Sequence, residues 1–399
     1  MKMLHFGNII VLIAMSFLTS GCWDRIELNN RALVMASGID LKDDGSLLLT
    51  DQVILPINLS KGLGTLRQQF ITVSATGRNI LDAGQNMQAK LSRKYFLGHR
   101  RIIFIGEKLA KHGLSGIMDE FTRNPDVRLR SDVFVVENGT AEHALHIRSP
   151  LEQYPSLAIM KSRKFVGGDI GTTLLPFLMA SVHPTSSPTF PVMKIVPESP
   201  HSNKTTFQFM GRAVFNKQLK LIGYLNYSEA AYRLWVLNTL STYQATFKLN
   251  TDKDSAKGKG YATIDFSKFH SRINPVFQNG RLHYVVNLTG KGILRESENN
   301  IKFKSPEDIN LVEKKAEKEV KWRVNDLIAK VQHQYHTDIF GFDLALARKY
   351  PRQWKTAKRH WTEIFSDVPV QVNTRIKIQA VGQTSESIVS PKEAERGQW

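Results

Sequence analysis

The first half of the chain alternates short apolar runs with amphipathic segments. Runs rich in Val, Ile and Leu predict strands, and they lie at Ala32–Ile39, Leu47–Ile57, Phe70–Ala75, Arg101–Gly106 and Asp132–Val136. Apolar residues at steps of three and four predict helices, around Ile80–Leu91, Leu114–Phe121, Ala141–Ile147 and Thr172–Ser181. Strands that alternate with helices favour βαβ crossovers, so we expect at least some parallel pairing.

The second half opens with a predicted hairpin, Thr206–Phe215 and Leu219–Leu225. Ser228 is a suitable N-cap for a short helix that ends near Asn238. Further strands are predicted from apolar or alternating runs, at Tyr243–Leu249, Tyr261–Phe266, Leu282–Leu288 and Val370–Val381. A short helix is predicted near Pro351–Phe365.

The clearest predicted element is a helix from Ser305 to about Tyr335. Its apolar residues recur at steps of three or four, and acid-first charge pairs stand four residues apart on its surface. At about 1.5 Å per residue it would be roughly 45 Å long. We expect it to lie across a sheet, and a coiled coil is the alternative. The pattern predicts an α+β fold: mixed β-sheets with packed helices in two or three lobes, and one long amphipathic helix in the C-terminal half.

Prolines divide the chain near its middle. Five of the 15 prolines lie within residues 184–204, mixed with Ser, Thr and His, and predict an extended linker. We therefore predict an N-terminal domain over residues 22–183, of one or two lobes, and a C-terminal domain over 205–382. Residues 383–399 are predicted to be a tail.

The amino terminus has the pattern of a bacterial lipoprotein signal. A basic start precedes the apolar run Phe6–Leu18, which is shorter than the roughly 20 residues that span a bilayer. Small residues follow, and then the one cysteine, Cys22. We predict a signal peptide over residues 1–21, cleavage before Cys22, and a lipid anchor there (diacylglyceryl and N-acyl groups). Thr19 stands where a lipobox usually has Leu; a plain secretory signal or an uncleaved anchor is the alternative.

Charge and cysteine content narrow the function classes. The formal net charge is +18, which in the cytosol would suggest nucleic acid as a partner. On the outer surface of a membrane, the same charge favours anionic lipid headgroups or an acidic protein partner, so no nucleic acid is predicted. A single cysteine excludes intramolecular disulfides, CxxC motifs and cysteine-based zinc or Fe–S sites.

Candidate catalytic and metal-binding chemistry is sparse. His143/His146 and His333/His336 each stand three residues apart, but a metal site needs a third ligand and none is identifiable. Gly62-Leu63-Gly64 lacks the remainder of a phosphate-binding loop. The chain has no Gly-x-Ser-x-Gly or His-Glu-x-x-His motif. We predict no catalytic residue, no metal and no cofactor, and hence a protein that is not an enzyme.

Two basic clusters stand out along the chain. The first comprises Lys90, Arg93, Lys94, Arg100 and Arg101; the second, called here the C-terminal basic cluster, comprises Arg348, Lys349, Arg352, Lys355, Lys358 and Arg359. Aromatic residues interleave the second cluster and could suggest base stacking. Trp354, Ala357, Trp361 and Phe365 fall on one helical face, however, so we expect them in a core with the cations on a solvated face. These cations either face the membrane or an acidic partner, or are ordinary solvated residues.

Several short motifs stand in order from Cys22 to about Val381. They are Gly21–Leu28, Gly38-Ile39-Asp40, Gly98–Ile102, Gly106–Ala110 with Gly113, Asp338–Phe342, Pro351–Trp354 and Trp361. Their order and spacing resemble the Ger(x)C spore germination lipoproteins, and Cys22-Trp23-Asp24 is the most specific piece.

The resemblance implies the C subunit of a nutrient germinant receptor. Such a subunit works beside two membrane-embedded subunits, A and B, on the extracytoplasmic face of the spore inner membrane. The resemblance also implies a mixed α+β fold with several lobes. Of the family's residues, only Cys22, the lipidation site, carries over with a defined role. Direct binding of the germinant is left open. The alternative is a solute-binding lipoprotein that captures a small nutrient, which would need two matched lobes around a cleft.

Overall fold

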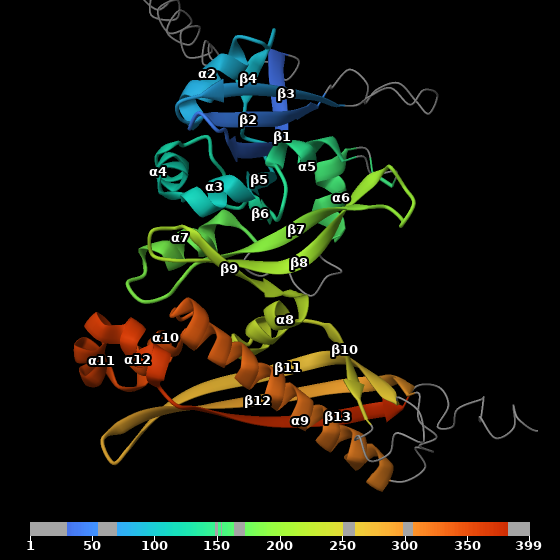
Figure 1. Ribbon diagram of the computed structural model, residues 1–399, viewed down its shortest axis with the longest axis vertical. Helices are drawn as coiled ribbons and strands as arrows, with labels where there is room; N and C mark the ends of the chain where they lie inside the picture. The colour runs from blue at the N-terminus through green and yellow to red at the C-terminus, as the bar shows by residue number, and fades with distance from the viewer. Residues whose placement is uncertain are drawn as a thin grey trace, which may run out of the picture.

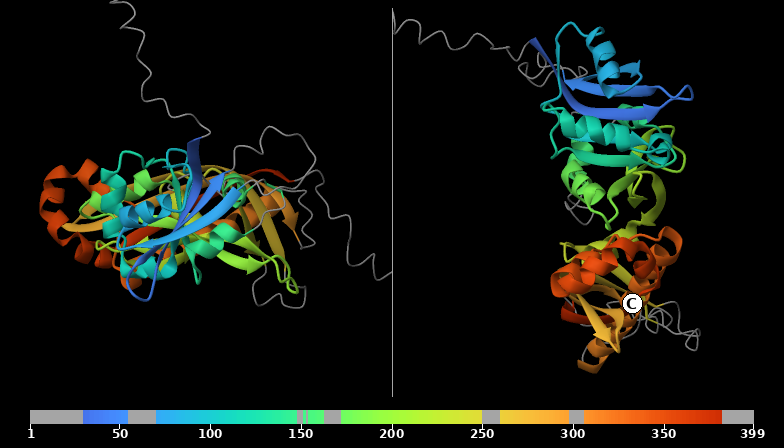
Figure 2. Two further views of the ribbon diagram at one scale, coloured as in Figure 1. Left: turned by 90° about the horizontal axis from the view of Figure 1, so that it is seen from above. Right: turned by 90° about the vertical axis from the view of Figure 1, so that its left-hand side faces the viewer.

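The computed structural model describes residues 30–54, 70–147, 151–152, 154–162, 172–249, 260–297 and 306–381. These residues form two β-sheets with packed helices, stacked end to end in an elongated molecule (Figure 1). Figure 2 shows the same elongation from the side, with a narrow waist between an N-terminal and a C-terminal lobe. The α+β class predicted from the sequence is confirmed.

The larger sheet belongs to the N-terminal lobe, in the upper part of Figure 1. Its strands are β1 (Arg31–Leu41), β2 (Leu47–Ile54), β3 (Phe70–Gly77), β4 (Lys94–Phe96), β5 (Ile102–Gly106), β6 (Asp132–Val136), β7 (Thr189–Pro197), β8 (Thr205–Phe215) and β9 (Leu221–Asn226). The order is β3-β2-β1-β5-β6-β7-β8-β9, with β4 on β1. The pairs β1–β5, β5–β6 and β6–β7 are parallel, as the helix–strand alternation predicts.

Helices cover both faces of this sheet. One core lies under α2 (Ile80–Gln88), α3 (Glu107–His112), α4 (Ser115–Arg123) and α7 (Leu174–Val182). A second core lies under α5 (Ala141–His146) and α6 (Pro155–Ser162) on the other face. Because β5 and β6 are buried on both faces, each reads as a continuous apolar run rather than an alternating one.

Residues 184–204, predicted as a linker, include strand β7 of the large sheet. β7 pairs with β6 in parallel and with β8 antiparallel, so this proline-rich stretch is part of a folded sheet. Pro188 precedes the strand and Pro197 ends it, and Pro191, inside the strand, lies one residue before the pairing with β6 begins at Val192. The domain limits 22–183 and 205–382 stay a prediction.

The C-terminal lobe is a four-stranded sheet crossed by a long helix. The strands β10 (Tyr243–Lys248), β11 (Tyr261–Gln278), β12 (Arg281–Ser297) and β13 (Val370–Val381) are ordered β10-β11-β12-β13. Helix α9 (Pro306–Lys330) lies across them and continues as a π-helical turn, η5 (Val331–Tyr335). Its predicted apolar stripe is buried in the core of this lobe, which favours helix on sheet over a coiled coil.

Shorter helices complete the C-terminal lobe: α8 (Tyr227–Val236), α10 (Phe342–Lys349), α11 (Pro351–Ala357), the 3₁₀ turn η6 (Lys358–His360) and α12 (Trp361–Asp367). The N-cap of α8 is Asn226, not the predicted Ser228. The Asn226 side chain accepts from the Glu229 amide at 2.9 Å, and the Glu229 carboxylate accepts from the Asn226 amide at 2.7 Å.

Strands β11 and β12 are far longer than predicted. They form one hairpin closed by Asn279-Gly280, both with positive φ, in the manner of a type I′ turn. On the β11 side the outer residues of this hairpin are a mixture of exposed and half-buried positions, so they do not form the continuous apolar run on which the prediction depended.

Candidate functional site

Cys22, the predicted lipid anchor, lies outside the described residues, as do Thr19 and Gly62-Leu63-Gly64. In the described ranges no helix is both long and apolar enough to cross a bilayer. The two histidine pairs gain no third ligand, and the described part of the chain holds no metal-binding group of three or more His, Cys, Asp or Glu. His146 Nδ1 instead lies 2.9 Å from the Glu142 carbonyl oxygen, and His336 Nδ1 lies 3.2 Å from Ser366 Oγ.

The two lobes meet where residues 183–187, at the start of the predicted linker, dock on residues 337–343. The Ser187 amide donates to the Asp338 carbonyl oxygen at 3.0 Å. The Ser186 and Thr185 hydroxyls both donate to Asp343 Oδ2, the former at 2.9 Å. Ser186 and Asp338 also form an isolated parallel β-bridge. Asp338–Phe342, one of the motifs identified in the sequence, thus forms the C-terminal side of a polar junction, which we call the lobe junction.

Asp338 organises its own loop within this junction. Its Oδ1 accepts from the amides of Phe340 and Gly341, each at 2.9 Å, and its Oδ2 accepts from the Asp343 amide at 3.0 Å. The side chain is 1% exposed. Burial, and then the negative charge of Asp343, raise the pKa of Asp338 to about 7. A carboxyl group that exchanges its proton near neutral pH therefore lies between the lobes.

Basic side chains lie around the two aspartates. His183 Nδ1 is 3.2 Å from Asp343 Oδ2. The Lys217 ammonium donates to the carbonyl oxygens of His183, at 2.8 Å, and Ser186, and Arg233 Nε donates to the Ile339 carbonyl at 3.0 Å. Burial lowers the pKa of Lys217, although both aspartates oppose the shift. The charges of Lys217 and Arg233 partly offset the cost of burying the two carboxyl groups at the junction.

A second contact between the lobes lies nearby at Gly223 on β9. The hydroxyl of Tyr335, at the end of η5, donates to the Tyr224 carbonyl oxygen at 2.9 Å, and the Lys330 ammonium donates to the same oxygen at 3.0 Å. A Cβ atom on Gly223 would lie 2.4 Å from the Tyr335 ring. The end of the long helix therefore packs directly on the edge of the N-terminal sheet, where only glycine leaves room.

Arg100, assigned from the sequence to the first basic cluster, is buried inside the N-terminal lobe. It is 2% exposed, its guanidinium carbon lies 5.2 Å from the centroid of the Phe121 ring, and its Nη1 donates to Ser37 Oγ at 3.4 Å. The expectation that this cation belongs to an exposed basic face is wrong. Its position before the buried strand β5 gave no sequence signal that the side chain turns inward.

Two carboxyl groups accompany Arg100 in this interior. Asp51 is fully buried and accepts from the Tyr95 hydroxyl. Glu120 accepts from Asn124 Nδ2 at 2.7 Å through one oxygen, and its other oxygen is buried without a hydrogen bond. Burial raises the pKa of both groups, while the charge of Arg100 opposes the shift. The charge of Arg100 therefore favours the ionised form of buried Asp51 and of half-buried Glu120 without a direct hydrogen bond to either.

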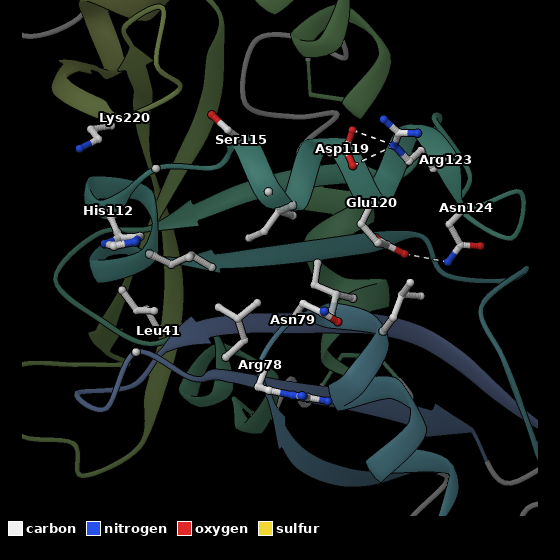
Figure 3. A pocket seen from close by; sticks show the side chains of 18 of the residues that line it. Leu41, Arg78, Asn79, His112, Ser115, Asp119, Glu120, Arg123, Asn124 and Lys220 are labelled. Atoms are coloured by element: carbon white, nitrogen blue, oxygen red, sulfur yellow. Dashed lines mark hydrogen bonds and ion pairs between the residues drawn. The ribbon is translucent and has the colours of Figure 1, made fainter.

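Glu120 also borders a surface groove of about 1030 Å³ between α2, α3, α4 and the β8–β9 turn (Figure 3). Leu41, Leu109 and Ile117 supply part of its apolar wall. Asp119 at its rim is paired with Arg123 at 2.9 Å. Figure 3 shows the labelled polar side chains spread around the groove, with His112 and Lys220 at one end and Asp119 and Arg123 at the other. A catalytic site requires polar side chains that converge on one point, and these side chains do not converge.

Comparison with known proteins identifies the family. The family described as "Spore germination protein N-terminal domain" matches residues 24–195, and the family described as "Spore germination B3/ GerAC like, C-terminal" matches residues 210–382. The chain belongs to the Ger(x)C family of spore germination proteins. The resemblance noted from the sequence motifs is thereby confirmed.

Similarity to individual Ger(x)C proteins extends over almost the whole chain. Spore germination protein KC of Bacillus subtilis (strain 168) is 26% identical over 393 residues, which cover 94% of this chain and 95% of the relative. Spore germination protein B3 of the same organism is 26% identical over 378 residues, covering 92% and 96%. The crystal structure of the GerBC protein superposes with a TM-score of 0.53 at 21% identity, covering 86% of this chain and 96% of that one. GerBC therefore shares this fold.

The first prediction concerns Arg100. Arg100→Met keeps much of the contact with Phe121 but removes the positive charge near Asp51 and Glu120, so we expect the free energy of unfolding to fall by about 1–3 kcal/mol. Urea denaturation followed by far-UV circular dichroism measures the change. Arg101→Met, at the exposed neighbouring position, is the matched control and should change the value by less than about 0.5 kcal/mol. Equal values for the two variants would show that Arg100 has no such role.

The second prediction concerns the pH dependence set by Asp338. The folded-state pKa of about 7 lies above the ordinary value of 3.8, so the folded protein holds a proton that the unfolded chain releases. This contribution to stability is full below pH 3.8 and is lost as the pH rises through 7, with a slope of at most about 1.4 kcal/mol per pH unit. Asp338→Asn should flatten the fall in unfolding free energy between pH 4.5 and 7.5.

Chemical denaturation at several pH values tests the Asp338 prediction. Asp326→Asn, at an exposed carboxylate on α9, serves as the control and should keep the slope of the unmodified protein. A slope for Asp338→Asn that equals the control would contradict the assignment, whatever the absolute stabilities of the two variants.

Proposed function

We propose that this chain is the membrane-anchored lipoprotein subunit of a spore germinant receptor, required for nutrient-triggered germination together with membrane-embedded A and B subunits. The observation that carries the proposal is the family membership of both halves of the chain, over residues 24–195 and 210–382. The relatives that span more than nine-tenths of this chain have names that describe spore germination proteins.

The place of action follows from the amino terminus. The signal pattern of residues 1–21 directs the chain across the membrane, and lipidation at Cys22 would hold it on the extracytoplasmic face of the spore inner membrane. Two or more acyl chains give stable anchoring where a single chain gives only marginal attachment. The described part of the chain starts at residue 30, eight residues beyond the anchor. Residue 30 would therefore lie within about 28 Å of the anchor.

The proposed role is one of assembly rather than chemistry. The buried polar groups described above serve the internal structure: the charge of Arg100 favours the ionised forms of Asp51 and Glu120, and Asp338 and Asp343 organise the lobe junction. The side chains around the surface groove spread apart instead of converging. This arrangement supports a protein whose output is the position of its lobes against partner subunits and the membrane.

The third prediction tests the anchor. Cys22→Ala in the full-length gene product should move the protein from the membrane pellet to the supernatant of a salt-washed spore membrane fraction, because the acyl chains are missing. Thr19→Leu, which completes the usual lipobox, is the matched control and should leave the protein in the pellet. Retention of Cys22→Ala in the pellet after the salt wash would mean that the apolar run Phe6–Leu18 or a tight partner holds it.

The fourth prediction tests the receptor assignment. Affinity capture of the full-length protein from detergent-solubilised spore membranes should recover two multispanning subunits in constant proportion to it. A solute-binding lipoprotein would instead bring a solute transporter with it. Recovery of a transporter, or of no multispanning protein under conditions that keep the lipoprotein folded, would overturn the assignment as a receptor subunit.

A further inference from the structure

Helix α7 presents an apolar stripe to solvent. Leu174 and Phe177 point into the core, whereas Leu175, Met179 and Val182 are 43%, 64% and 82% exposed. These three residues stand four and three positions apart, so they share one face of the helix. The helix carries no charged side chain. Its outer face is therefore apolar although it lies at the surface.

A neighbouring loop extends this face. The Leu175 amide donates to the Leu129 carbonyl oxygen at 3.0 Å, which holds the loop against the start of α7. Leu129 is 37% exposed, and the arginines on either side of it, Arg128 and Arg130, are exposed as well. We call Leu129, Leu175, Met179 and Val182 the α7 patch. It is an apolar surface that is bordered by two cations, Arg128 and Arg130, near the start of α7.

The grouping distinguishes this patch from the other exposed apolar side chains. The others in the described residues stand at least ten positions apart along the chain and form no group of three on one helix; they are Leu81, Leu151, Tyr227, Tyr261, Leu311, Trp322 and Leu344, of which Leu311 and Trp322 share α9. Single exposed apolar residues are normal at protein surfaces, whereas a group of them indicates a surface that is covered in use.

The C-terminal basic cluster lies on the same side of the molecule as α7. All six of its cations are exposed, and they are carried by α10, α11 and η6. In Figure 1 these helices and α7 both lie at the left of the molecule, and the right-hand view of Figure 2, which looks at that side, shows both in front. One long flank thus carries an apolar patch on the N-terminal lobe and a run of cations on the C-terminal lobe.

We propose that this flank lies against an anionic lipid bilayer, with the α7 patch entering the headgroup layer and the C-terminal basic cluster on the lipid phosphates. The proposal rests on the proposed function in that it takes a membrane to be the neighbouring surface. An exposed apolar helical face bordered by cations on a neighbouring loop can bury its side chains at the headgroup boundary while the cations stay at the lipid phosphates. The negative surface potential of anionic lipids attracts such cations. The flank would contact the lipid through the α7 patch on the N-terminal lobe and the C-terminal basic cluster on the C-terminal lobe. The long axis of the molecule would then lie parallel to the membrane surface.

The experiment uses the single cysteine of the chain. The mature protein, residues 22–399 with Cys22→Ser, keeps all described residues and has no thiol. Met179→Cys in this background gives one site for an environment-sensitive dye, and Leu311→Cys, at an exposed apolar residue of α9 (49% exposed), gives the matched control. Each labelled protein is mixed with vesicles of phosphatidylcholine alone or with one-third phosphatidylglycerol.

With anionic vesicles, the dye at residue 179 should shift to shorter wavelength and be quenched by nitroxide lipids, while the dye at 311 should not respond. Binding should fall as salt rises. Each of Arg128→Gln and Arg130→Gln should weaken binding by about fivefold, and Lys355→Gln with Lys358→Gln and Arg359→Gln should weaken it further. Leu175→Ser with Val182→Ser should weaken it by roughly tenfold or more.

Other outcomes overturn the proposal. Absence of a response at residue 179 with anionic vesicles at low salt would exclude the membrane contact, as would equal responses at 179 and 311. A response at 179 that requires the multispanning subunits and is insensitive to lipid charge would assign the patch to a protein partner. Because the chain tested has no lipid anchor, such failures leave the Cys22 anchor and the receptor assignment standing on their own experiments.

Discussion

The position of the two lobes relative to each other depends on the docking of residues 183–187 against the loop of residues 337–343. Burying two carboxyl groups at such a contact is costly unless each finds partners. Asp338 finds them in three backbone amides of its own loop, and Asp343 in the Thr185 and Ser186 hydroxyls of the other lobe. The first set fixes the shape of the loop and the second joins that loop to the N-terminal lobe. The same pair of aspartates thus links the local fold to the position of the lobes.

The long helix provides the second part of this arrangement. Along its length, Glu313 and Glu317 accept from the amides of Ile378 and Ile376 on β13, at 2.8 and 2.9 Å. β13 is an edge strand, and these carboxylates occupy amides that would otherwise be open to pairing with another chain. At its far end, Tyr335 packs on Gly223 of the N-terminal lobe. One helix therefore protects the edge of the C-terminal sheet and reaches the edge of the N-terminal one.

The sequence predicted the elements whose burial leaves a local pattern, either a continuous apolar run as in β6 or a periodic apolar stripe as in α9. β6 and β13 occupy the predicted residues, and the apolar stripe of α9 is buried as its spacing required. On β11, residues 267–278 lack a continuous apolar run, and the prolines of β7 favoured a linker. Each strand is instead defined by its neighbours in the sheet: β11 pairs with β12 across the Asn279-Gly280 turn, and β7 pairs with β6 and β8. The same limit applies to the sites. The motif containing Asp338 was recognised, but its contact with residues 183–187, 150 positions away, was not. Arg100 was assigned to the surface because a buried cation is detectable only once Asp51 and Glu120 are brought beside it.

The α7 patch is directly connected, along the chain, to the lobe junction. Val182 is the last residue of α7, and His183, which follows it directly, begins the segment that docks on Asp343. A bilayer that held α7 in its headgroup layer would therefore fix the N-terminal side of the junction at the residue next to His183, which contacts Asp343. The C-terminal basic cluster begins at the end of α10, whose second residue is Asp343 itself. Both membrane-facing elements are thus covalently continuous with the two sides of the junction. Any change in the angle between the lobes must then change how the flank lies on the lipid, and a partner that moves the flank must in turn strain the contact between Asp343 and residues 183–187.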